Sequence, residues 1–190
     1  MMTEEYDDDD GRRVWLDRTE LKQLVETLGK PRRKLAARLG AEAGLRSHEI
    51  VAVEPRHVYH DPEASTMLKV PEGKGDKYRE TVIPGRVAEV IEALGHGAEA
   101  EPVVDVSKRS LRYWIADARK ELLEEDTRWQ YVTSHDLRRT WAGMLANADV
   151  DETVALRWGG WNDLETFLDH YRGEATAKAQ ARERSKVNWL

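Results

Sequence analysis

Hydrophobic side chains recur every three or four positions over most of this chain, which is the spacing of one face of an α-helix. The first such segment can be capped by Asp17 or Thr19, and Gly29 can end it. Its apolar positions are Leu21, Leu24, Val25 and Leu28. Pro31 suits the first turn of a second helix, which we expect to run to about Gly44.

The pattern changes in the middle of the chain to alternating and β-branched residues interrupted by turn-forming ones. This pattern is typical of short strands, and we expect three of them, near 57–60, 65–70 and 78–83. Residues 72–76 (Glu-Gly-Lys-Gly-Asp) are the expected turn of the last hairpin. Helices are predicted elsewhere, at 47–53, 86–94, 108–124, 134–147, 151–158, 163–172 and 174–188. The predicted fold class is mainly α with a small three-stranded antiparallel sheet (α+β).

Composition and length favour a single water-soluble domain. The chain has 190 residues, of which 35% are charged and 40% are hydrophobic. The lack of cysteine excludes disulfides and thiolate metal sites. No apolar run approaches the roughly 18 residues that a membrane span needs. We therefore expect a cytoplasmic protein that has no membrane segment.

The formal charge of −6 is spread unevenly along the chain. Residues 1–10 hold six acids and no lysine or arginine, so the rest of the chain balances 30 acids with 30 bases. We expect residues 1–12 to be an acidic disordered tail and residues 13–190 to be the folded domain. From Lys30 to Arg56, seven bases stand against three acids. This excess suits a polyanion such as nucleic acid, and it suits a solvated helix surface equally well.

The segment 134–140 (Ser-His-Asp-Leu-Arg-Arg-Thr) carries the strongest chemical signal. His135 and Arg138 are three positions apart, so a helix presents them on one face. An imidazole can move a proton near neutral pH, and a guanidinium can grip two phosphate oxygens at once. The pair therefore suits chemistry on a phosphate, although two solvated polar residues would show the same spacing.

Three further segments offer groups for the same chemistry. Arg46 stands where one helix ends and the next begins, and Glu49 can hold its guanidinium; an ordinary surface pair is the alternative. Lys74 lies in the glycine-rich turn and could reach a leaving oxygen. Trp161 follows two glycines and could donate its indole N–H to an anion. Tyr171 lies at the end of the helix predicted at 163–172, where a core-edge tyrosine is the alternative to a nucleophile.

Taken in chain order, these residues resemble the catalytic domain of the tyrosine recombinases of the phage-integrase type. The resemblance covers about residues 15–175 and rests on Arg46, Lys74, His135-x-x-Arg138, Trp161 and Tyr171. It implies the fold of that domain and an enzyme that cleaves and rejoins DNA strands. It implies no cofactor and no metal.

The resemblance also assigns roles. Tyr171 would attack the scissile phosphate and form a 3′-phosphotyrosyl link, and Arg46 and Arg138 would bind the non-bridging oxygens. His135 would assist proton transfer at the tyrosine, and Lys74 would protonate the departing 5′-oxygen.

The remaining assignments concern DNA and assembly. Trp161 would donate a hydrogen bond to the phosphate. Further DNA contacts are expected from Arg32, Arg33, Lys34, Lys77 and Arg139. The expected partners are double-stranded DNA and other copies of the chain, in a homotetramer on DNA that exchanges C-terminal helices.

Two departures from the family pattern keep alternatives open. The family usually places its tyrosine nine residues after the His/Trp position, which is His170 here, whereas Tyr171 lies at ten. The family's N-terminal helical DNA-binding domain has no counterpart, which indicates either a fragment or a stand-alone catalytic domain. The alternative functions are a catalytically silent DNA-binding module and a relaxing enzyme like the type IB topoisomerases.

Overall fold

The structure is a computed structural model that describes residues 1–6, 11–63, 65–70, 78–161, 165, 167, 184 and 185. Its helices are α1 (Arg18–Thr27), α2 (Pro31–Ala43), α3 (Ser47–Ile50), α4 (Gly85–Gly95), α5 (Lys108–Leu122), α6 (Ser134–Asn147) and α7 (Glu152–Gly159). Short 3₁₀ turns lie at η1 (Pro55–His57) and η2 (Thr127–Tyr131). The strands are β1 (Met2–Glu5), β2 (Arg12–Trp15), β3 (Val58–Asp61), β4 (Ser65–Val70) and β5 (Arg79–Val82). The predicted helix at 134–147 is confirmed, and the helices expected after residue 162 lie almost wholly outside the described residues.

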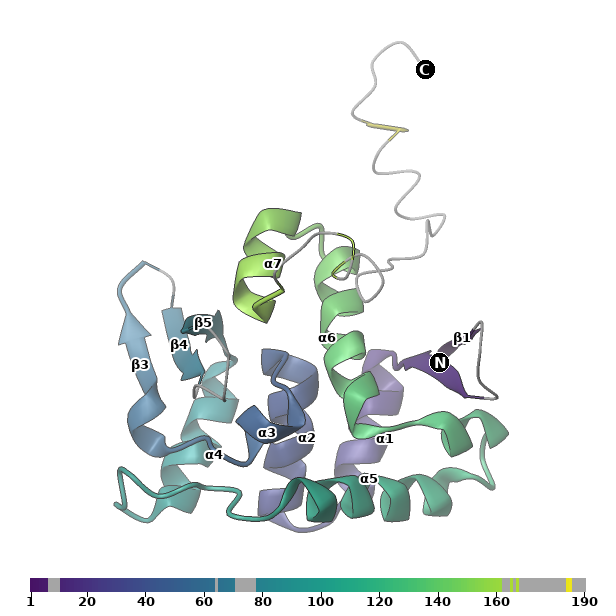
Figure 1. Cartoon of the computed structure of the whole chain (residues 1–190), viewed down its shortest axis with the longest axis horizontal. Coiled ribbons are helices and arrows are strands. Elements are labelled where there is room, and N and C mark those ends of the chain that lie inside the picture. The colour runs from purple at the N-terminus through teal and green to yellow at the C-terminus, as the bar shows by residue number, and fades with distance from the viewer. Residues whose placement is uncertain are drawn as a thin grey trace.

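Helix α2 is the centre of the fold, with α1, α3, α4, α5 and α6 packed around it. Figure 1 shows α5 crossing below it, the three-stranded sheet to one side, and α7 above it, between the sheet and the upper part of α6. Small residues allow this close packing: a Cβ atom added at Gly40 would lie 2.9 Å from Cβ of Leu137 in α6. The C-terminal end of α2 therefore lies in the middle of the molecule, and Arg46 follows it by three residues.

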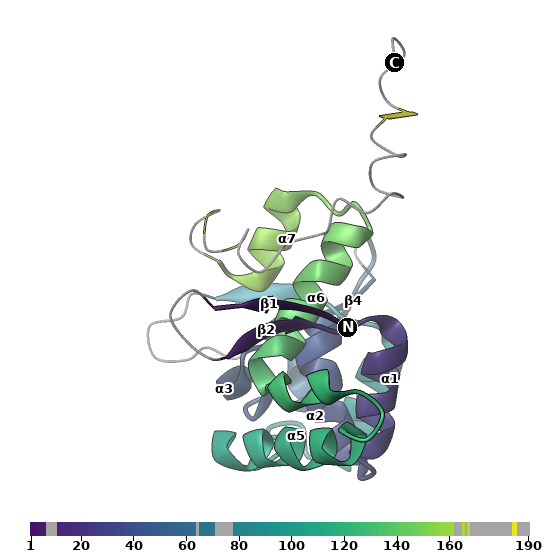
Figure 2. The same cartoon turned by 90° about the vertical axis from the view of Figure 1, so that its right-hand side faces the viewer.

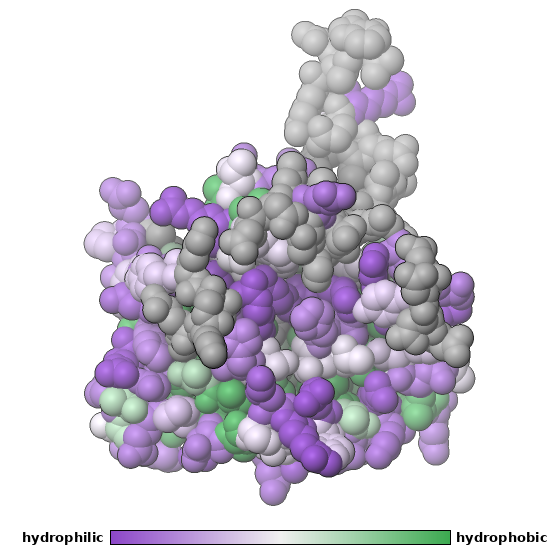
Figure 3. Space-filling model, in the orientation of Figure 1, coloured by the Kyte–Doolittle hydropathy of each residue, from purple (hydrophilic) through white to green (hydrophobic). Residues whose placement is uncertain are grey.

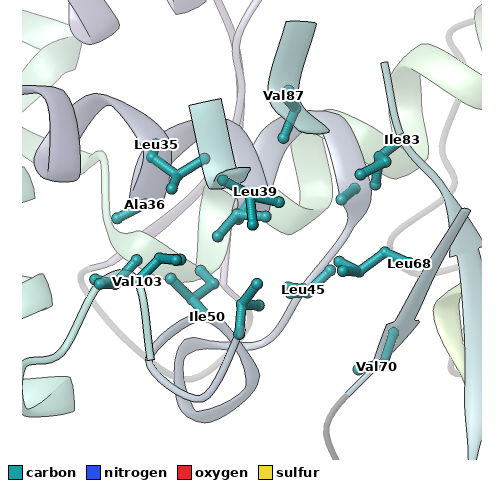
Figure 4. Packing of buried hydrophobic residues seen from close by; sticks show 14 of the residues in the cluster. Leu35, Ala36, Leu39, Leu45, Ile50, Leu68, Val70, Ile83, Val87 and Val103 are labelled. Carbon is teal, nitrogen blue, oxygen red and sulfur yellow. The ribbon is translucent and has the colours of Figure 1, made fainter. Parts of the chain in front are cut away.

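Two hydrophobic clusters lie on opposite sides of α2. The first joins α2 and α3 to the sheet and α4, as Figure 4 shows for Leu39, Ile50, Leu68 and Val87. The second joins α2 to α1, α5 and α6 and includes the fully buried Leu24. Burial of this apolar surface supplies the main stabilising free energy of such a fold.

The three-stranded sheet has the order β3-β4-β5, and both pairs are antiparallel. Leu68 pairs with Val58 on one side and with Thr81 on the other. The three predicted strands are confirmed to within a residue or two at each end. The turn expected at 72–76 lies outside the described residues.

The first residues of the chain differ from the expected disordered tail. Met2–Glu5 forms strand β1, which pairs with β2 so that Glu4 lies opposite Arg13 and Glu5 opposite Arg12. The acids are thus compensated by bases on the neighbouring strand, and opposite charges across a strand pair are stabilising. Figure 2 shows this hairpin in front of α6, with which β2 is in contact. The expectation of disorder is therefore wrong for residues 2–5, while residues 7–10 lie outside the described part.

The start and end of α1 follow the predicted signals. Asp17, not Thr19, caps the helix, with its Oδ1 accepting from the N–H groups of Thr19 at 2.7 Å and Glu20 at 2.9 Å. Gly29 follows the helix with a φ of +66°, which glycine adopts without strain. Local side-chain chemistry therefore sets both ends of this helix.

Candidate active site

Three arginines from different elements meet at the C-terminal end of α7. Its last carbonyl oxygens accept consecutively: Trp158 O from Arg79 Nη1 at 2.8 Å, Gly159 O from Arg138 Nη2 at 2.5 Å, and Gly160 O from Arg46 Nη2 at 3.0 Å. The carbonyl end of a helix carries partial negative charge, so it is a favourable place for cations. The sequence predicted the meeting of two of these arginines, Arg46 and Arg138.

Arg46 is placed by the junction between α2 and α3. Gly44 ends α2 with a φ of +69°, and the extended Arg46 then precedes the first turn of α3. Glu49 Oε2 accepts from the Arg46 backbone N–H at 2.6 Å, and Glu49 Oε1 accepts from Arg46 Nη1 at 3.1 Å. Glu49 thus contacts both the backbone and the guanidinium of Arg46, and this carboxylate is 1% exposed.

Arg138 is buried, and its described contacts include two backbone carbonyls and an aromatic ring. Nη1 donates to Gly44 O, Nη2 donates to Gly159 O, and Cζ lies 4.0 Å from the centroid of the Trp161 ring. A desolvated cation above an indole face is stabilised by about 2 kcal/mol. These contacts fix the orientation of the guanidinium without neutralising it.

Trp161 lies in a small aromatic cluster behind Arg138. Its ring stacks on Trp141 with centroids 5.9 Å apart, and it meets Phe167 edge-on at 4.9 Å. A Cβ atom at Gly159 would lie 1.7 Å from the Trp161 ring, so only glycine fits there. The structure thus shows Trp161 supporting Arg138, and donation of its indole N–H to a phosphate stays a prediction.

Arg79 and its link to Glu49 were missed by sequence reasoning. Arg79 Nη2 donates to Glu49 Oε2 at 2.6 Å, and the arginine side chain is 6% exposed. The available signal was the alternation of β5, which places Arg79 and Thr81 on its buried side. A buried arginine needs a partner. That partner is distant in sequence, so the pattern could not name it.

The four charged groups just described give the site an electropositive character. The guanidinium groups of Arg46 and Arg79 pair with the carboxylate of Glu49, and that of Arg138 meets the same end of α7, so these four groups together carry a formal charge of +2. In Figure 3 the described surface below α7 is largely hydrophilic. Such a cluster can bind a phosphodiester and stabilise the extra charge that develops when it is attacked.

His135 is exposed and lies in the first turn of α6, one turn before Arg138. Its backbone N–H donates to Thr133 Oγ1 at 3.3 Å, and Thr133 caps the helix. The predicted shared face of the pair is therefore a consequence of a regular, capped helix. Its role in proton transfer stays a prediction.

Arg139 differs from the prediction that it contacts DNA. Its Nη1 donates to Asp136 Oδ1 at 2.5 Å, its Nη2 donates to Tyr6 Oη at 2.8 Å, and only 7% of the residue is exposed. Asp136 also accepts from Val14 N at 3.1 Å. We therefore correct the assignment: Arg139 faces the β1–β2 hairpin and helps to hold it on α6.

The other predicted DNA contacts are spread over the chain. Arg32 and Lys34 lie in the first turn of α2, about 14–17 Å of helix from its C-terminal end. Arg33, between them, stacks over Trp114 at 5.2 Å. Their contact with DNA stays a prediction. The remaining predicted residues, Lys74, Lys77 and Tyr171, lie outside the described residues.

Tyr59 is one tyrosine that the structure disfavours as a nucleophile. Its hydroxyl donates to Glu80 Oε2 at 2.7 Å, and this hydrogen bond raises the pKa of Tyr59 to about 12. Hydrogen bonds from Tyr78 and Tyr59 in turn lower the pKa of Glu80. A nucleophilic tyrosine needs the opposite shift, because the phenolate is the reactive form.

Within the described ranges, no three His, Asp or Glu side chains gather as metal ligands. None of the helices in that part of the chain is long and apolar enough to cross a membrane.

Comparisons with known proteins agree with the geometry. A profile of the phage integrase family matches residues 14–178. The fold is similar to XerA recombinase, with a TM-score of 0.71 and 18% identity over 92% of this chain and 66% of that one. It is also similar to Tn1549 transposon integrase in complex with a circular intermediate DNA, with a TM-score of 0.70 and 14% identity over 96% of this chain and 68% of that one.

A shorter relative covers the same region. The catalytic domain of bacteriophage HP1 integrase is similar with a TM-score of 0.63 and 17% identity, over 90% of this chain and 94% of that one. A search of curated proteins found no match. The chain thus spans about two thirds of the solved XerA and Tn1549 chains and nearly the whole of the HP1 catalytic domain.

Proposed function

Because the chain belongs to the phage integrase family, we propose that it is the catalytic domain of a tyrosine recombinase, which cleaves and rejoins DNA strands through a 3′-phosphotyrosyl intermediate. The observation that carries the proposal is the convergence of Arg46 and Arg138 on the consecutive carbonyls of Gly160 and Gly159. Two guanidinium groups fixed side by side can bind both non-bridging oxygens of one phosphate.

The chemistry follows from the charge on the phosphorus centre. A phosphodiester carries one negative charge, and attack by an oxygen nucleophile places further negative charge on the equatorial oxygens. Fixed cations in a partly desolvated site stabilise that charge, and loss of one such donor typically costs about 10²–10³-fold in rate. We assign this work to Arg46 and Arg138.

The other steps are assigned to residues that the resemblance names. Tyr171 Oη attacks phosphorus, the bond to the 5′-oxygen breaks, and the tyrosine becomes linked to the 3′-phosphate. His135 assists proton transfer at the tyrosine, whose ordinary pKa of about 10 requires such help. Lys74 delivers a proton to the departing 5′-oxygen. The covalent link conserves the phosphodiester energy for rejoining.

We further propose that the partner is double-stranded DNA inside the cell. Similar structures include the Tn1549 integrase with transposon right end DNA and XerH recombinase bound to its difH substrate. The proposed assembly on DNA is a homotetramer that exchanges C-terminal helices. Its phosphate contacts would make DNA binding weaken steeply with salt.

A nicked suicide duplex tests the proposed reaction. Incubation should give a protein–DNA adduct that resists denaturant, because the cleaved strand fragment diffuses away and rejoining is prevented. The adduct should be absent with Tyr171→Phe and should persist with the matched control Tyr131→Phe.

The distance of Tyr171 from Trp161 along the chain favours one alternative function, a catalytically silent DNA-binding module. Tyr171 lies ten residues after Trp161, where the family has nine, and one residue turns a helical side chain by about 100°. A catalytically silent DNA-binding module would bind the duplex and never form the adduct. An adduct that is lost with His170→Phe and kept with Tyr171→Phe would move the chemistry to another residue and contradict our assignment.

A further inference from the structure

Arg79 connects three segments of the candidate site, although no step of the reaction has been assigned to it. It begins β5, and its guanidinium reaches Glu49 in α3 and Trp158 O at the end of α7. We infer that Arg79 is a positioning residue: it holds Arg46 through Glu49, and it holds the end of α7 on which Arg46 and Arg138 meet. The inference rests on the proposed function and adds a residue to it.

The first link runs through the carboxylate of Glu49. Its Oε2 accepts from both the Arg46 backbone N–H and Arg79 Nη2, each at 2.6 Å, and its Oε1 accepts from Arg46 Nη1 at 3.1 Å. Donors on both oxygens prevent the carboxylate from turning. Because Glu49 is 1% exposed, water cannot readily replace a lost donor. Without Arg79, the donors to this carboxylate within the described residues would be those of Arg46, and the carboxylate would no longer be fixed independently of the side chain that it positions.

The second link runs through the end of α7. Arg79 Nη1 donates to Trp158 O at 2.8 Å, one residue before the carbonyl that receives Arg138. The Arg79 side chain also packs on Gly160, where an added Cβ atom would lie 2.4 Å from Arg79 Cδ. Gly160 has a φ of +64°, so the absence of a side chain there serves both the turn and the contact. Arg79 therefore supports the peptide segment that orients both phosphate-binding arginines.

The geometry requires an arginine and not simply a cation. The two contacts of Arg79 use different terminal nitrogens of one rigid fork, and they reach acceptors in different elements. A lysine ammonium is a compact point charge and cannot copy that arrangement. Arg79→Lys therefore removes the geometry and keeps the charge.

The main test compares Arg79→Lys with Arg86→Lys in single-turnover cleavage of the nicked duplex. Arg86 is a matched control because it forms a similar ion pair with Glu42, at 2.8 Å, and its side chain is 60% exposed. We expect Arg79→Lys to cleave about 100-fold more slowly, as for groups displaced by about 1 Å, with little change in DNA affinity. Arg86→Lys should cleave at the wild-type rate. Equal rates for all three proteins would overturn the inference.

A substrate with a neutral methylphosphonate at the scissile position separates positioning from general damage. Removing the oxygen's charge reduces the need for Arg46 and Arg138, so the defect of Arg79→Lys should shrink to under about tenfold on this substrate. The same reduction should appear with Arg46→Lys. A defect of equal size on both substrates would indicate a loosened fold and would overturn the positioning role. If Arg79→Lys does not fold, Glu49→Gln tests the same link. The ratio of its cleavage rates on the phosphodiester and the methylphosphonate substrates is then compared with the wild-type ratio, and equal ratios overturn the positioning role.

A crystal structure of Arg79→Lys distinguishes failure of this inference from failure of the proposed function. We expect the Arg46 guanidinium to leave Gly160 O. If wild type forms no adduct but this displacement occurs, the proposed function fails and the positioning role stands. If wild type cleaves DNA and Arg46 keeps its place in the variant, the positioning role fails and the function stands.

Discussion

Arg138 and Arg139 are neighbours in sequence and are both buried, yet their side chains leave α6 in different directions and have different roles. Arg139 pairs with the carboxylate of Asp136 at 2.5 Å and faces the β1–β2 hairpin. The contacts described for Arg138 are the carbonyls of Gly44 and Gly159 and the Trp161 ring. The carboxylate of Asp136 offsets the charge of Arg139 and fixes its side chain toward the hairpin, whereas Arg138 is oriented toward the end of α7, where Arg46 also donates. For these two neighbours, the direction of the side chain, more than its burial, therefore separates the structural arginine from the one proposed to bind phosphate.

Arg138→Lys tests the phosphate-binding side of this comparison and should have the largest effect. A lysine cannot reach both carbonyls and a phosphate, so we expect adduct formation to fall about 10³-fold, with a small change in thermal stability. The measurement is the single-turnover cleavage rate at saturating DNA. Arg139→Lys is the matched control, because it keeps a cation beside Asp136 and should cleave close to the wild-type rate. Similar losses of cleavage rate in Arg138→Lys and Arg139→Lys would contradict the distinction between a phosphate-binding and a structural arginine.

Asp136→Ala tests the structural side. The substitution leaves Arg139 buried without its carboxylate and removes the acceptor of Val14 N, so we expect the free energy of unfolding to fall by about 3–5 kcal/mol. Urea denaturation followed by circular dichroism measures the change. Asp117→Ala removes an exposed carboxylate paired with Lys120 and should cost under about 1 kcal/mol. The structural role fails if the two variants are equally stable.

Tyr6→Phe tests the structural role of Arg139 by removing a single hydroxyl group, and it should have the smallest effect. It deletes the hydroxyl that accepts from Arg139 Nη2 at 2.8 Å and keeps the ring, 5.7 Å from the guanidinium. We expect a loss of about 1 kcal/mol in the free energy of unfolding, and unchanged cleavage by the folded protein. Tyr113→Phe removes a similar hydroxyl that receives Arg109 at 2.9 Å on an exposed surface, and it should be neutral. Slower cleavage at full stability would place Tyr6 in the site instead.

The sequence predicted those parts of the fold that depend on local pattern. The helix at 134–147 could be read because its apolar spacing is regular and its first turn is capped. The three central strands were visible from their alternating residues and turn signals. The shared face of His135 and Arg138 followed from helix geometry alone.

What the sequence could not give depends on pairs of distant residues. Strand β1 was hidden because its acids indicate disorder until Arg12 and Arg13 are placed opposite them. Arg139 resembled a DNA contact because nothing in the pattern places Tyr6 beside it. Arg79 was overlooked for the same reason, since Glu49 and Trp158 reach it only through the fold.

The order of acceptors at the end of α7 has a mechanical consequence. Trp158, Gly159 and Gly160 are consecutive, so nearly planar peptide groups join the three carbonyls that receive Arg79, Arg138 and Arg46. A twist of this last turn would release all three side chains together and not one at a time.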